Sequence, residues 1–93
     1  MPYEWLAAAF GVLMRHGIAE HEVLQILYAQ HRLPVPVRSH YGLAMLNILG
    51  RTGAGRLLVV TVRPAGGFDT QIVGARDMTD AEREEFLAWE NDR

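Results

Sequence analysis

Four side chains in this 93-residue sequence combine the chemistry of proton transfer with that of phosphate binding. His16 is a histidine, the residue type most often used to take up or release a proton during a reaction. Arg51, Arg56 and Arg76 each carry a planar guanidinium fork, which suits the oxygens of a phosphate. We take these four residues as the candidate catalytic set.

The sequence places His16 at the end of an expected helix, directly before Gly17. A helix C-terminus stabilises the imidazolium form, because the backbone carbonyl groups there carry partial negative charge. This position favours His16 as the acid–base group. The alternative is that His16 only caps its helix beside Gly17.

The arginines lie around turns of an expected antiparallel meander. Arg51 and Arg56 flank a glycine-rich hairpin turn, and Arg76 ends the following strand. Neighbouring antiparallel strands bring the start of one beside the end of the next. We therefore expect Arg56 and Arg76 to converge at one end of the sheet. The helix that begins after Thr79 adds free N–H groups, which also favour an anion.

Arg76 and Arg56 also have purely structural alternatives. Arg76 precedes several acids, so it could instead form an ion pair with Asp77, Asp80 or Glu82. Arg56 could be a solvated turn residue. Exposed ion pairs are common on protein surfaces and contribute little stability.

The sequence gives no indication of a metal or a cofactor. It contains no cysteine, and His21, His31 and His40 do not have the spacing of a zinc site. We therefore predict a domain that holds neither.

Helical periodicity dominates the first third of the chain. A first helix is predicted from Tyr3 to His16, with an apolar stripe formed by Leu6, Phe10, Leu13 and Met14. A second helix is predicted over residues 19–30, with an inward face formed by Val23, Ile26, Leu27 and Leu24. Pro34 and Pro36 restrict residues 35–38 to an edge strand.

From residue 43 the apolar period changes to that of strands, over residues 43–49, 56–63 and 70–76. The middle run is apolar on both faces, which predicts a central strand covered on both sides. A final helix follows from Asp80 to about Glu90, with Thr79 and Glu82 forming a capping box and Ala81, Phe86 and Trp89 on its buried side. Residues 1–93 are thus predicted to form a single α+β domain with two N-terminal helices, an antiparallel meander sheet of three to four strands and a C-terminal helix.

Charge is unevenly distributed along the chain. Residues 1–64 hold six arginines and three acids, whereas residues 65–93 hold three arginines and eight acids. All the basic residues are arginine, which suits phosphate binding but is also the bias that a GC-rich genome produces. No uncharged apolar run reaches the length of a membrane span, and the lack of cysteine is compatible with a reducing compartment. We expect a cytoplasmic protein with no membrane association.

Four segments in order carry a family resemblance: YEW, RHGIAEHEVLQIL, ILGRTGAGRLLVVTV and IVGARDMTDAERE. Together they resemble the BrnT family of toxins from type II toxin–antitoxin systems. That family shows an aromatic-Glu-Trp start, a basic residue before His-Gly, a Gly-Arg hairpin and a strand that ends in Ala-Arg before a Thr-capped helix. The resemblance spans nearly the whole chain.

The resemblance implies a RelE-like fold and a metal-independent ribonuclease that inhibits translation. It also implies that a cognate antitoxin protein neutralises the toxin. The implied assembly is a homodimer of the toxin or a heterotetramer of toxin and antitoxin. His16 matches the family's histidine, while Arg51, Arg56 and Arg76 match its arginines. RNA is the implied substrate.

A second hypothesis keeps the fold without the catalysis. In that case the chain is a protein-binding module, for an antitoxin-like repressor or another subunit. The acidic last helix favours this alternative, because its carboxylates repel phosphates. We expect this helix to pack through Phe86 and Trp89 and to turn its acids towards solvent or a basic partner.

Overall fold

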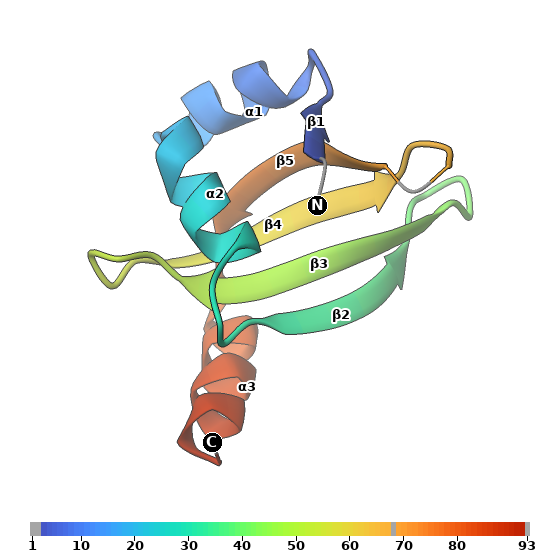
Figure 1. Ribbon diagram of the computed structural model, residues 1–93. Coiled ribbons are helices and arrows are strands. Elements are labelled where there is room, and N and C mark those ends of the chain that lie inside the picture. The colour runs from blue at the N-terminus through green and yellow to red at the C-terminus, as the bar shows by residue number, and fades with distance from the viewer. Residues whose placement is uncertain (1–2, 68, 93) are drawn as a thin grey trace.

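A five-stranded mixed sheet lies at the centre of the protein, with helices on both faces (Figure 1). The computed structural model describes residues 3–67 and 69–92. In chain order the elements are β1 (Tyr3–Trp5), α1 (Ala9–His16), α2 (Glu20–Leu27), β2 (Leu33–Arg38), β3 (Ala44–Arg51), β4 (Leu57–Pro64), β5 (Thr70–Asp77) and α3 (Asp80–Asn91). The strand order is β1-β5-β4-β3-β2. The predicted α+β layout is confirmed, and the sheet has five strands rather than three or four.

The additional strand is β1, which was predicted to be part of the first helix. Tyr3 and Trp5 pack towards the core while Glu4 is exposed, an alternation of period two that is typical of a strand. β1 pairs in parallel with β5, with Glu4 opposite Gln71. The remaining neighbours, β2 to β5, form the predicted antiparallel meander.

Strand β4 is buried on both faces, as its apolar pattern predicts. Leu58, Val60 and Val62 join the cluster beneath α1 and α2. Val59 faces the other way and packs in the cluster around Phe86 of α3. The central strand is therefore covered by helices on both sides.

Helix α1 begins at Ala9, later than predicted, and this changes which face it buries. Ala9 and Leu13 are buried, whereas Met14 is 83% exposed. Phe10 stacks on Trp5 with ring centroids 5.1 Å apart and stays partly exposed. Of the predicted stripe only Leu13 is buried in α1: Phe10 and Met14 are exposed, and Leu6 lies before the helix, because the chain first forms β1 and the helix begins only at Ala9.

Helix α2 buries Val23, Ile26 and Leu27, as predicted, but Leu24 is exposed and the helix ends at Leu27. Ile26 packs against the backbone of Gly50 in β3, where an added Cβ would lie 3.0 Å from the isoleucine Cγ2. Close approach of helix and strand thus explains a glycine inside β3. The edge strand predicted at residues 35–38 is confirmed and extends over Leu33–Arg38.

Helix α3 covers the opposite face of the sheet from α1 and α2 (Figure 1). Thr79 is its N-cap: the hydroxyl accepts from the Glu82 amide, and the Glu82 carboxylate accepts from the Thr79 amide. Phe86 is fully buried and Trp89 packs beside it, as predicted, while Ala81 is exposed.

Phe86→Ala should lower the free energy of unfolding by about 3–5 kcal/mol, because it leaves a cavity between α3 and the sheet. Leu87→Ala is the matched control, since Leu87 is 36% exposed. Urea unfolding would measure both. An equal loss in the two variants would show that α3 is not held by Phe86.

Candidate functional site

His16 and Arg76 line the same hollow, although they lie 60 positions apart in the sequence. The hollow encloses about 280 Å³ beside β5, between the end of α1 and the sheet. Val12, Thr61 and Val73 also contribute to its walls. Helix α1 reaches this position because Gly74 lets Val12 approach β5 closely: an added Cβ at Gly74 would lie 3.0 Å from the valine Cγ1.

Arg76 does not present a free guanidinium to the hollow. Its two terminal nitrogens donate to the two carboxylate oxygens of Glu82, at 2.6 and 2.9 Å. The guanidinium, together with the Thr79 amide, lowers the pKa of Glu82 to about 2. Two roles were considered for Arg76, phosphate binding and an ion pair with a nearby acid. The structure shows the ion pair with Glu82. A bidentate pair of this kind holds the guanidinium plane in one orientation.

Arg56 joins three segments of the chain. Its guanidinium makes a bidentate pair with Asp77 at 3.0 and 3.1 Å, and it donates to the carbonyl oxygens of His16 and Gly17 at 3.1 and 2.9 Å. A longer contact of 3.4 Å reaches Glu22 of α2. Arg56 therefore satisfies the last carbonyl groups of α1 and fixes the backbone of His16 relative to β5.

Arg56 and Arg76 lie at the same end of the sheet, as expected, but their side chains go to opposite faces. Arg56 contacts Gly17 and Glu22 on the α1–α2 side, whereas Arg76 contacts Glu82 of α3. The expected convergence fails because successive residues of a strand alternate between faces, so the partner of Arg56 is Asp77.

Arg51 lies apart from the hollow. Its guanidinium makes a bidentate contact with Glu90 near the end of α3, at 2.7 and 3.3 Å. That pairing lowers the pKa of the Glu90 carboxyl through the hydrogen bond from Arg51. Glu82 and Glu90 of the acidic helix thus contact basic residues of their own chain.

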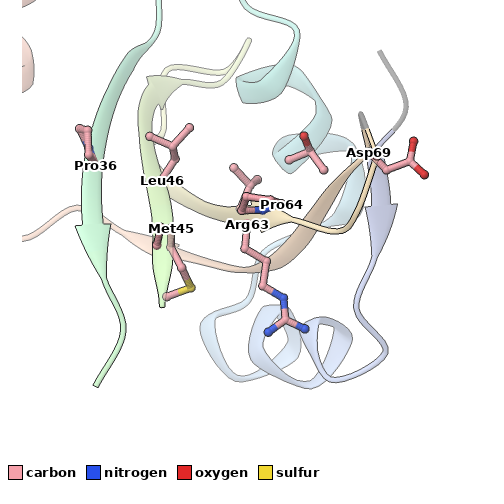
Figure 2. A pocket seen from close by; sticks show the side chains of 10 residues that line it. Pro36, Met45, Leu46, Arg63, Pro64 and Asp69 are labelled. Atoms are coloured by element: carbon pink, nitrogen blue, oxygen red, sulfur yellow. The ribbon is translucent and has the colours of Figure 1, made fainter. Parts of the chain in front are cut away.

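A larger hollow of about 420 Å³ lies at the other end of the sheet (Figure 2). Its walls include Pro36, Leu46, Val62 and Pro64, with Arg63 and Asp69 at its margin. None of the four candidate residues lines it, and its surface is largely apolar. In the described ranges 3–67 and 69–92, no group of three histidine or acidic side chains could hold a metal ion, and no helix is long and apolar enough to cross a membrane.

Three ion pairs of the arginines were not predicted from the sequence: Arg56 with Asp77, Arg56 with Glu22, and Arg51 with Glu90. Asp77 was weighed only as a partner of Arg76, yet it pairs with Arg56. The strand alternation of Arg76 and Asp77 was the available signal. Glu22, which lies in the first turn of α2, also contacts Arg56.

Comparison with known proteins adds no assignment: no protein-family model matches the sequence, and no curated protein matches it at a significant level.

The Arg76–Glu82 pair predicts a specific dependence of stability on pH. The folded-state pKa of Glu82, about 2, lies below its ordinary value of 4.5. Its contribution is therefore complete above about pH 4.5 and is lost as the pH falls towards 2. Glu82→Gln retains the cap hydrogen bonds but should flatten this part of the stability profile, measured by urea unfolding. Glu84→Gln, at an exposed position of α3, should follow the wild type. A Glu82→Gln profile as steep as the wild type would contradict the assignment.

Arg56→Ala should destabilise the fold by about 2 kcal/mol, because it leaves Asp77 and two helix carbonyl groups without their donor. Arg15→Ala is the control, since Arg15 is exposed on α1. Thermal unfolding compares the two. A loss no larger than that of Arg15→Ala would mean that Arg56 does not tie α1 to β5.

Proposed function

We propose that the chain is a BrnT-like toxin, a metal-independent ribonuclease that inhibits translation and is neutralised by an antitoxin protein in the cytoplasm. The proposal rests on one observation: His16 and Arg76 both line the same hollow. The resemblance in sequence order and motif supports the same assignment.

In the proposed reaction, the ribose 2′-oxygen attacks the phosphorus while the bond from phosphorus to the 5′-oxygen breaks. His16 takes the proton of the 2′-hydroxyl and then gives it to the leaving 5′-oxygen. Arg76 stabilises the negative charge that builds on the phosphate, as preorganised cations do in phosphoryl chemistry. Arg56 holds the backbone at His16 through the carbonyl contact, so its role is positioning. Arg51 has no part at the reacting phosphate.

Binding of RNA must compete with Glu82 for Arg76. Both ligands use paired oxygens on the same guanidinium fork, so a phosphate can replace the carboxylate with little change in geometry. The exchange has a cost, because the displaced carboxylate lies near the phosphate and repels it. We therefore infer a slow ribonuclease whose activity rises when Glu82 is neutralised.

A second candidate function is a binding module of the same fold without catalysis. The observation that favours it is the pairing of Arg51, Arg56 and Arg76 with carboxylates. Three satisfied cations leave less positive surface for RNA. In that case a partner protein is the ligand.

Expression of wild type, His16→Ala and Arg76→Ala tests the two candidates. For a ribonuclease, Arg76→Ala should reduce cleavage of RNA on the order of 100-fold, the scale of one lost oxyanion donor, and His16→Ala should abolish it. Growth inhibition and RNA cleavage would be measured beside thermal unfolding. No cleavage by the wild type, or equal cleavage by all three proteins, would leave only the binding module.

Glu82→Gln also distinguishes the ribonuclease from the binding module, through an expected gain in cleavage rather than a loss. Freeing Arg76 should increase RNA cleavage several-fold if the hollow is catalytic, because the competing charge is removed. Glu85→Gln is the control on the exposed side of α3. Unchanged cleavage in Glu82→Gln would show that Arg76 does not contact the reacting phosphate.

A further inference from the structure

Three polar side chains form a row across β1, β5 and β4, beside the hollow that His16 and Arg76 line. Glu4 is opposite Gln71 in the parallel pair, and Gln71 is opposite Arg63 in the antiparallel pair. Residues in register on neighbouring strands point to the same face of a sheet. All three side chains line one further hollow of about 500 Å³, which also includes Leu43 and Pro64.

The row lies on the same face of β4 as the candidate catalytic hollow. Thr61 lines that hollow, and Arg63 follows two residues later, so the near margins of the two hollows are roughly 7 Å apart along the strand. Arg76 is opposite Val59, four residues from Arg63, which is roughly 13 Å along β4. A β-bulge between Thr61 and Val62 separates them. Bulges of this kind re-aim side chains next to binding sites. An extended single strand that passes the first hollow would therefore bring a neighbouring base to the row.

Arg63 differs from the arginines of the candidate site in its partner. Its Nε donates to the amide oxygen of Gln71 at 2.7 Å, and no described residue forms an ion pair with it. The neutral amide orients the guanidinium while its two terminal nitrogens remain available as donors. Figure 2 shows Arg63 and Met45 leaving their strands on the side opposite to Leu46, with the guanidinium directed away from Asp69.

Glu4 supplies the complementary acceptor. It is exposed on β1, and no described residue forms an ion pair with it either. Its Cα lies two strands from that of Arg63, a distance of roughly 10 Å from the spacing of neighbouring strands. The Glu4 carboxylate, an acceptor, and the Arg63 guanidinium, a donor, thus lie on either side of a gap about the size of a planar base. The Gln71 amide lies between them.

We propose that Glu4, Gln71 and Arg63 form a guanine-binding subsite for the RNA nucleotide adjacent to the cleaved phosphate. Guanine presents two donors side by side, N1–H and the N2 amine, which match the two oxygens of one carboxylate. Its O6 and N7 accept from arginine, the commonest specific contact to this base. Adenine lacks the paired donors. The proposal rests on the proposed function for its substrate class.

The test measures binding of fluorescein-labelled pentaribonucleotides by anisotropy, in the His16→Ala background to prevent cleavage. The three probes are a uridine pentamer with guanine, hypoxanthine or adenine at the centre. Guanine should bind about 10- to 100-fold more tightly than adenine, the range expected for one bidentate base contact. Hypoxanthine, which lacks the N2 amine, should fall between them.

Glu4→Gln should remove the preference for guanine while leaving the adenine pentamer within twofold of its original affinity. Arg63→Ala should weaken binding of all three pentamers and weaken the guanine pentamer most. Glu20→Gln, an exposed acid on α2, is the matched control, and circular dichroism would confirm the fold of each variant. Equal binding of guanine and adenine, a preference that survives Glu4→Gln, or no binding of any pentamer would overturn the subsite.

The same experiment separates this proposal from the ribonuclease assignment. Guanine-selective binding without cleavage by the His16-containing protein would retain the subsite and reject the nuclease. Cleavage without a base preference would retain the nuclease and reject the subsite.

Discussion

Burial of β4 on both faces is the constraint on which the rest of the structure depends. Leu58, Val60 and Val62 require a cover on one side and Val59 requires one on the other. Each fully buried aliphatic side chain contributes about 1.5–3 kcal/mol relative to an exposed one, so an uncovered face would be costly. Helices α1 and α2 meet the first requirement, and α3 meets the second.

This two-sided cover also determines where the candidate site lies. The end of α1 and the start of α3 approach the same end of β5 from opposite faces. His16 comes from one helix, Arg76 from the strand, and Glu82 from the other helix. A side chain from each layer therefore lies at this end of the sheet.

Ion pairs with carboxylates account for the orientation of the arginines in this acidic chain. The arginines at this end of the sheet are held by carboxylates, and the lowered pKa of Glu82 shows how strongly its charged form is favoured. These pairs keep the guanidinium groups oriented without a ligand. In the proposed ribonuclease, the same carboxylate that orients Arg76 also competes with the substrate, so orientation and inhibition come from one contact.

The strands and helices that bury apolar residues in a clear period could be predicted from the sequence. The period-two run of β4, the Thr79 cap of α3 and the edge strand with Pro34 and Pro36 are examples. Strand β1 could not be recognised within a longer apolar stretch, because three residues are too few to establish a period. Its pairing with β5 is a tertiary contact.

The sequence predicted that Arg56 and Arg76 lie at one end of the sheet, but it did not predict the partners of their guanidinium groups or the separate position of Arg51. Turn positions brought Arg56 and Arg76 to one end of the sheet, and the capping box identified Glu82. The side of the sheet on which each guanidinium lies depends on the β4–β5 register, and local sequence does not determine that register. Arg56 consequently pairs with Asp77, and the contact between Arg56 and His16 is through the backbone carbonyl.

The central claim is that His16 and Arg76 bind one phosphate in one hollow. Its most direct test is a nuclear magnetic resonance titration of the protein with a 2′-O-methyl RNA oligonucleotide, which cannot be cleaved through its 2′-oxygen. The signals to follow are the imidazole of His16 and the Nε–H groups of the arginines. If both residues bind one phosphate, the His16 and Arg76 signals should shift together with a single affinity, while the Arg51 signal stays in place. Shifts confined to Arg51, or no shift of His16 at saturation, would contradict it.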